Sequence, residues 1–231
     1  MNLFDTTIIN FINQFSQLSW TTDSAIIFIS GNHLIKGGVL LIIFWWGWFR
    51  INANQTYIQV HLVSTLFGCF IAMAIARTLA LLLPFRFRPI HEEGLNFTSP
   101  YGMNITTLEG WSSFPSDHAV LFYALAAGMF YISKKVGIFS LVYTTLFIGL
   151  PRVYLGLHYP TDIIGGAIIG VVVILLCNSN YFIENISRPA HNYSNTKPEI
   201  FYPIFFIITY QIADMFNNSR AFFRLLEILL S

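Results

Sequence analysis

The chain has 231 residues, of which 55% are hydrophobic and only 10% charged, and its formal net charge is +1 at pH 7. Soluble domains carry about a quarter charged residues, so this composition and a mean hydropathy of +0.62 exclude an ordinary soluble fold and favour an integral membrane protein. The small net charge and scattered basic residues give no reason to expect a nucleic-acid partner. Because apolar runs follow one another without a polar domain between them, we expect one all-α membrane domain over residues 1–231.

The N-terminal segment, residues 1–32, is predicted to lie at the membrane interface. In residues 3–15 the apolar side chains recur at helical spacing on one face, and the polar ones, Asp5 among them, fall elsewhere. A further short apolar piece follows at residues 24–30 and is interrupted by Gly31 and Asn32.

About six membrane spans are expected in the rest of the chain. They are predicted at residues 33–49, 57–83, 119–133, 136–150, 163–177 and 200–216. Gly165, Gly166 and Gly170 in the fifth span favour close helix packing. Residues 219–231 place polar and apolar side chains on opposite helical faces, which predicts a second interfacial helix. The predicted architecture is therefore a polytopic helix bundle with an interfacial helix at each end.

Two polar segments interrupt the apolar pattern and hold candidate site residues. Residues 84–116 form a loop far longer than most connections in a compact bundle, which favours a functional role. The stretch 151–162 holds Arg152, His158 and Asp162 between two apolar runs, where ionisable groups that serve no purpose are costly. If the backbone is helical from about His158, the four-residue spacing puts the Asp162 carboxylate on the same face as the imidazole.

The alternation of spans places both polar segments on one side of the membrane. Cations outside the motifs are more numerous on the other side, which receives Arg50, Lys134, Lys135, Arg188 and Lys197, against Lys36, Arg220 and Arg224 on the site side. By the positive-inside rule, the site is expected to face away from the cytoplasm.

Three short motifs share the site side: Arg88-Pro89, Pro115-Ser116-Asp117-His118, and Arg152 followed by His158 and Asp162. Together they resemble the type 2 phosphatidic acid phosphatase (PAP2) superfamily, whose pattern is Lys-x6-Arg-Pro, then Pro-Ser-Gly-His, then Ser-Arg-x5-His-x3-Asp. The resemblance covers roughly residues 57–178, which we expect to be the motif-bearing core. It implies a phosphatase in the inner membrane of a bacterium, acting on lipid phosphate or pyrophosphate without metal or other cofactor.

The residue types agree with phosphoryl transfer, which needs a nucleophile, an acid and donors for the phosphate oxygens. His158 would attack phosphorus and form a phosphohistidine, while Asp162 would hold the other ring nitrogen. His118 would protonate the leaving group and then activate water. The phosphate oxygens would be bound by guanidinium, hydroxyl and backbone N–H donors, from Arg88, Arg152, Ser116 and the helix start near His118.

The chain departs from the family pattern at three positions. Leu81 stands where the family has Lys, which leaves Arg77, inside a span, or Arg86, in the loop, to supply that cation; Arg77 is slightly favoured because an intramembrane Arg needs a reason. Asp117 replaces Gly and brings a carboxylate near the phosphate, so it either caps the helix or contacts another group, such as the next residue. Pro151 replaces Ser and removes a hydroxyl contact.

The substrate and two rival function classes stay open at this point. The Phe-Pro-Ser-Asp-His form resembles the bacterial branch that acts on undecaprenyl pyrophosphate, and phosphatidic acid or phosphatidylglycerol phosphate is the alternative. A catalytically inactive lipid-binding membrane protein would not need both His118 and His158. A transporter would need a midplane site on broken helices, whereas these polar residues gather at one membrane face. The expected partners are the lipid phosphate substrate and membrane lipids, and the oligomeric state is open.

Overall fold

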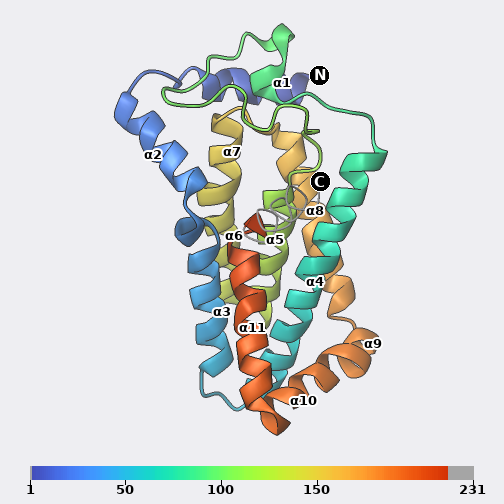
Figure 1. Ribbon diagram of the computed structural model, residues 1–231. Coiled ribbons are helices and arrows are strands. Elements are labelled where there is room, and N and C mark those ends of the chain that lie inside the picture. The colour runs from blue at the N-terminus through green and yellow to red at the C-terminus, as the bar shows by residue number, and fades with distance from the viewer. Residues whose placement is uncertain (1, 218–231) are drawn as a thin grey trace, which may run out of the picture.

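The computed structural model of the protein describes residues 2–217 and is drawn in Figure 1. Within that range it is helical without β-strands, which confirms the all-α prediction. The predicted interfacial helix at 219–231 lies outside the described residues. The α-helices are α1 (Leu3–Asn13), α2 (Trp20–Gly31), α3 (Val39–Phe49), α4 (Gln55–Leu82), α5 (Asp117–Gly128), α6 (Lys134–Thr144), α7 (Leu150–Tyr154), α8 (Pro160–Cys177), α9 (Asn180–Phe182), α10 (Arg188–Thr196) and α11 (Pro198–Ala213).

Short turns of tighter or wider helix connect several of these elements. Three π-helical turns lead into α3, α7 and α10; they are Leu34–Gly38, Thr145–Gly149 and Ile183–Ser187. The 3₁₀ turns are Pro89–His91 and Glu93–Leu95 in the long loop, and Met129–Tyr131 after α5. Otherwise the loop between α4 and α5 has no regular structure, as its polar composition predicted.

Fewer helices could cross a membrane than the sequence suggested. Three of the described helices are long and apolar enough, namely Gln55–Leu82, Lys134–Tyr154 and Pro160–Cys177. A fourth span exists if α2 and Leu34–Phe49, which bend by 63° at their break, are taken together. The prediction of about six spans is therefore not confirmed. The shortfall has a physical reason in α5, which has 12 residues that are mostly buried, so its apolar sequence reflects packing inside the bundle.

The structure corrects three boundaries that bear on the site. The helix expected at 136–150 continues through α7 to Tyr154, so Arg152 lies in its last turn and not in a loop. α8 begins at Pro160, not at about His158, because extended Tyr159 is its N-cap and Pro favours the first helical position. The stretch 178–199, which separates the predicted spans 163–177 and 200–216, is mostly helical in α9 and α10 and is not a plain loop.

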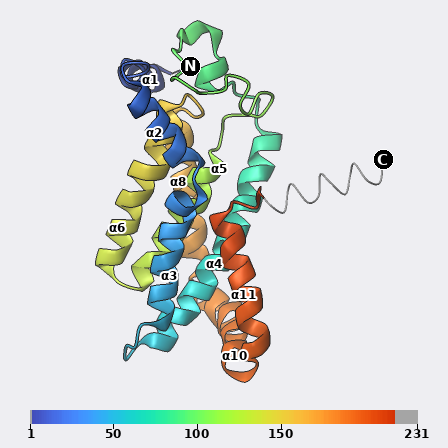
Figure 2. The same cartoon turned by 60° about the vertical axis from the view of Figure 1, so that its left-hand side comes forward.

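The centre of the bundle is formed by α4, α5 and α8, which pack against one another (Figures 1 and 2). Gly166 and Gly170 make this contact possible, as the small-residue pattern predicted. A Cβ atom at Gly170 would lie 2.4 Å from the backbone oxygen of Val120, and one at Gly166 would lie 2.9 Å from that of Ser116. The close approach fixes the start of α8 beside the start of α5, the elements that carry the second and third motifs.

α1 lies across the end of the bundle where the long loop and the start of α8 also lie, as Figure 1 shows. Its outer side exposes Phe4 and Phe11, and Phe15 just after the helix is also exposed, in agreement with an interfacial helix. Its inner side, however, buries Asp5 together with Ile9. The sequence predicted only that Asp5 lies off the apolar face, and the structure adds that its carboxylate is buried because it has partners in the bundle.

Candidate active site

His158 lies in the turn between α7 and α8 and is only 4% exposed. Its Nδ1 atom is 2.9 Å from the carbonyl oxygen of Ser113. Because a carbonyl only accepts hydrogen bonds, Nδ1 carries the proton and the Nε2 atom of the neutral ring holds a lone pair. Nε2 lies 3.2 Å from Nη1 of Arg88. Burial lowers the pKa of His158, and the charges of Arg88 and Arg152 act in the same direction against Asp162, so the ring is neutral near pH 7.

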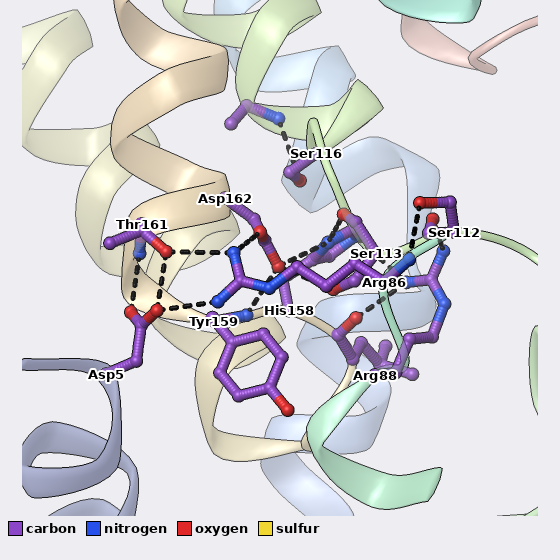
Figure 3. Close-up of polar contacts among 12 residues, drawn as sticks. Asp5, Arg86, Arg88, Ser112, Ser113, Ser116, His158, Tyr159, Thr161 and Asp162 are labelled. Atoms are coloured by element: carbon purple, nitrogen blue, oxygen red, sulfur yellow. Dashed lines mark hydrogen bonds and ion pairs between the residues drawn. The ribbon is translucent and has the colours of Figure 1, made fainter. Parts of the chain in front are cut away.

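Asp162, in the first turn of α8, is fully buried and holds the surrounding backbone in place. Its Oδ2 atom accepts from the Ser113 hydroxyl at 2.5 Å and from the backbone N–H of Tyr159 at 2.8 Å. The same oxygen is 3.8 Å from His158 Nδ1, an electrostatic contact, while the hydrogen bond of that nitrogen goes to Ser113 (Figure 3). Since His158 precedes the helix, the four-residue spacing brings the two side chains close without the direct bond that the sequence suggested.

Arg88 follows α4 by a few residues and is held by backbone oxygens. Its guanidinium donates to the carbonyls of Leu157, Ser112 and Trp111 at 2.6, 3.1 and 3.2 Å. Burial lowers the pKa of Arg88 to about 10, so it stays charged at neutral pH. The backbone contacts fix the plane of the guanidinium beside His158, a geometry suited to an anion.

Arg152 and His118 form the other half of the motif cluster. The guanidinium of Arg152 donates to the Nε2 atom of His118 and to the carbonyl oxygen of Ser30 at 3.4 Å. The Nε atom of Arg152 is buried and has no hydrogen-bond acceptor among the described residues. Ser116 is the N-cap of α5, and its hydroxyl accepts from the backbone N–H of Ala119 at 3.4 Å.

The two candidate replacements for the missing Lys have different surroundings. Arg77 forms an ion pair of 2.5 Å with Asp117 and lies over the ring of Trp111, with 36% of its side chain exposed. Asp117 thus contacts a cation, which is one of the two outcomes left open by the sequence. The charges of both Arg77 and Asp117 act on Arg88, so this pair lies near Arg88.

Arg86, the second candidate, lies at the Oδ1 atom of Asp162, whereas His158 faces the Oδ2 atom. Its Nη1 atom donates to Asp162 Oδ1 at 2.5 Å and to the hydroxyl of Thr161 at 3.0 Å, and its Nη2 atom donates to Asp5 Oδ2 at 2.7 Å (Figure 3). The guanidinium also lies over the ring of Tyr159, 4.1 Å from its centroid. Both terminal nitrogen atoms of the Arg86 guanidinium are therefore bonded to protein groups.

The structure brings all nine predicted site residues to the same end of the bundle, but it adds two that the sequence reasoning missed. Ser113 contacts both His158 and Asp162, and Asp5 reaches the cluster from α1. The single charged residue in an amphipathic helix was the available signal for Asp5, whereas Ser113 acts partly through its backbone and leaves no signal. Within residues 2–217 no group of three His, Cys, Asp or Glu side chains is placed to hold a metal ion.

Comparison with known proteins confirms the resemblance found in the motifs: residues 83–185 match the PAP2 superfamily. A bacitracin transport permease protein, BcrC, of Bacillus licheniformis is 41% identical over 64 residues, 28% of this chain and 31% of that protein. Undecaprenyl-diphosphatase BcrC of Bacillus subtilis is 25% identical over 65% of this chain and 70% of its own length. Phosphatidylglycerophosphatase B of the same organism is 28% identical over 43% and 44%. The chain thus spans less than a third of the first relative, and no solved structure gave a comparable match.

Proposed function

We propose that this chain, with its PAP2-superfamily region at residues 83–185, is a membrane enzyme that hydrolyses lipid phosphates or pyrophosphates through a phosphohistidine. The observation that carries the proposal is the state of His158. Its Nδ1 is tied to the carbonyl of Ser113, which leaves the Nε2 lone pair directed at the guanidinium of Arg88. A neutral imidazole with an anion-binding group at its unprotonated nitrogen is poised to attack phosphorus.

In the first step, Nε2 of His158 forms a bond to phosphorus while the bond from phosphorus to the leaving oxygen breaks. The imidazole then carries a positive charge, which the carboxylate of Asp162 stabilises from 3.8 Å. His118 is protonated once the guanidinium of Arg152 has turned from its Nε2 atom to the phosphate. The leaving oxygen takes this proton from His118, so the lipid alcohol or lipid monophosphate departs with it.

In the second step, water attacks the phosphohistidine. His118, now neutral, accepts a proton from this water as its oxygen bonds to phosphorus, and the bond to Nε2 breaks. Inorganic phosphate leaves, and both imidazoles regain their initial protonation states. The proton on Nδ1 stays hydrogen-bonded to the carbonyl of Ser113 throughout, so Nε2 serves as the nucleophile in each cycle.

The phosphate oxygens find three cationic groups. Arg88 is fixed by backbone oxygens, and the buried Nε of Arg152 is a donor that lacks an acceptor among the described residues, a role that a phosphate oxygen fills. Arg77 takes the part of the family's Lys, because its partner Asp117 is at the exposed side of the cluster and its charge acts on Arg88. Ser116 has a structural part, as it caps the helix that carries His118.

The proposed substrate is undecaprenyl pyrophosphate, presented at the extracytoplasmic face of the bacterial inner membrane. Support for the lipid comes from the B. subtilis undecaprenyl-diphosphatase, which aligns over most of its length. The proposed orientation of the site rests on the larger number of cationic residues outside the three motifs at the end of the bundle opposite the site, where α10 and the start of α6 lie (Figure 1). The phosphatidylglycerophosphatase relative favours a glycerolipid phosphate as the second candidate.

The test is hydrolysis by the purified protein in detergent with EDTA present. We expect phosphate release from undecaprenyl pyrophosphate without added metal, and none from a His158→Ala protein prepared in the same way. Absence of hydrolysis for every polyprenyl and glycerolipid phosphate tried would leave an inactive lipid-binding protein or a transporter, the class named by the B. licheniformis relative.

A competition assay then decides the substrate. Undecaprenyl pyrophosphate, phosphatidic acid and phosphatidylglycerol phosphate are offered together at equal concentration. Preference for the polyprenyl substrate supports the first candidate, and a preference of about tenfold for a glycerolipid, about 1.4 kcal/mol of transition-state discrimination, supports the second.

A further inference from the structure

We propose that Asp5 is a positioning residue for the reaction, acting through Arg86 on Asp162 and His158, so that α1 is part of the catalytic unit. This inference rests on the proposed function, since it concerns the same site. The side chain of Asp5 contacts Arg86 and Thr161, and it does not hydrogen-bond to His158 or Arg88. Its effect must therefore pass through the groups that it holds.

A chain of short contacts leads from α1 to the nucleophile. Both oxygens of Asp5 are used: Oδ1 accepts from the backbone N–H of Thr161 at 3.0 Å, and Oδ2 accepts from the Thr161 hydroxyl at 2.6 Å and from Arg86 at 2.7 Å. The other arm of Arg86 reaches Asp162 at 2.5 Å. Asp162 in turn fixes Ser113, whose carbonyl binds the Nδ1 atom of His158 (Figure 3).

The burial of Asp5 indicates that its contact with Arg86 is part of how α1 packs on the bundle and is not an incidental surface contact. The carboxylate is fully buried, although the helix exposes Leu3, Phe4 and Phe11 on its outer side. An unpaired buried carboxylate is costly, so the helix position is coupled to the presence of the Arg86 guanidinium. The amphipathic helix thus has its apolar side outward and one charged group inward.

Two carboxylates, those of Asp5 and Asp162, share the guanidinium of Arg86. If Asp5 were absent, the positive charge of Arg86 at 2.5 Å would largely cancel the negative charge of Asp162. The negative charge of Asp5 offsets part of the Arg86 charge. The carboxylate of Asp162 therefore retains more of its negative field toward His158. Asp5 in this way sets both the orientation and the electrostatic effect of Asp162.

This arrangement predicts opposite effects of two charge-removing substitutions on His158. The charged groups that act on its ring are Asp162 from α8, Arg88 from the loop and Arg152 from α7. Asp5→Asn removes a negative charge, which leaves Arg86 less balanced and lowers the pKa of His158. Arg86→Gln removes a positive charge and raises it. Glu92, which acts on Tyr159 beside Arg86, is unchanged in both variants.

The experiment measures kcat, KM and the acidic limb of the kcat/KM profile for full-length protein in detergent. Asp5→Asn is expected to lower kcat about tenfold with little change in KM, because Asp5 does not contact substrate. Its acidic limb should move down by about half a pH unit, and that of Arg86→Gln should move up by a similar amount. In the double variant the limb returns toward that of the wild type.

Asn13→Ala is the matched control on the same helix. Asn13 docks α1 to the long loop through Thr98, at 2.7 and 2.8 Å, and has no contact with Arg86. It should reduce thermal stability without moving the acidic limb. If Asp5→Asn behaves like Asn13→Ala, or if both charge variants shift the limb in the same direction, the inference is overturned. Wild-type inactivity would instead refute the proposed function.

Discussion

Two ion-pair clusters flank the nucleophile, and they differ in how they are built. The cluster of Asp5, Arg86 and Asp162 is closed: both carboxylates are fully buried, and hydrogen bonds to Thr161 and to backbone groups occupy their oxygens. The pair of Arg77 and Asp117 is open, with 36% and 19% of the two side chains exposed. A closed cluster holds geometry, whereas an open pair can exchange one partner for a substrate phosphate.

The energies expected for the two clusters differ accordingly. Removing one member of a buried ion pair leaves an uncompensated charge and costs about 3 to 5 kcal/mol, whereas an exposed pair contributes about 0 to 1 kcal/mol. Substitutions in the closed cluster should therefore reduce both stability and kcat. Substitutions in the open pair should act mainly on substrate binding.

The largest effect on the closed cluster is expected from Asp162→Ala. It leaves Arg86 beside a buried cavity, frees the Ser113 hydroxyl and removes the charge that stabilises the imidazolium of His158. We expect kcat to fall by about a thousandfold or more and the unfolding free energy by about 3 kcal/mol. Steady-state kinetics and thermal unfolding in detergent measure the two quantities. Near-wild-type stability would show that the cluster is not closed in the membrane protein.

Arg88→Ala tests the group that lies between the two clusters. Because its backbone contacts fix the guanidinium beside His158 Nε2, its loss should cost about 2 to 4 kcal/mol in the barrier, a factor of about 30 to 1000 in kcat/KM. Arg50→Ala is the control, since Arg50 lies at the far end of the bundle over the ring of Trp46. Equal losses from both would contradict a specific role for Arg88.

Arg77→Ala should have a smaller effect and a different signature. We expect KM to rise about tenfold with a modest loss of kcat, and the wild-type advantage to shrink as salt is added, because the side chain is partly exposed. Asp117→Asn releases Arg77 from its partner and should lower KM a few-fold. If Arg77→Ala changes kcat and stability but not KM, the contrast between the clusters is wrong.

The smallest effect concerns pH. The pKa of His158 is lowered by burial, and its nucleophilic form is the neutral ring, so activity is kept as pH falls until this pKa is reached. The acidic limb of kcat/KM should therefore lie below 6.5, the ordinary value for His. A basic limb should report the acid His118 and should vanish in His118→Ala assayed with a leaving group that needs no proton. An acidic limb well above 6.5 contradicts a buried, neutral His158.

The three motifs predicted which residues lie together in the site, because each motif is local and the apolar runs between the motifs place them on one side of the membrane. The sequence could not predict the partner of each charged side chain. The choice between Arg77 and Arg86 depends on where α1 lies, a contact between residues 81 positions apart. The bond from His158 Nδ1 goes to a backbone carbonyl, and any residue has one.

The predicted number of spans was not confirmed, for a similar reason. Apolar length alone does not separate a helix that faces lipid from one packed inside protein, and α5, with 12 residues, packs against α4 and α8 and has most of its residues buried. The burial of Asp5 could not be predicted either, because helical periodicity records polarity and not partners.

The central claim is that His158 Nε2 is the nucleophile, and the most direct measurement is labelling with a substrate carrying radioactive phosphorus, quenched in alkaline detergent. The account predicts a base-stable, acid-labile phosphoenzyme whose label maps to His158. His118→Ala should still form it with an activated leaving group, and His158→Ala should not. Label retained in His158→Ala, or mapped to another residue, would contradict the account.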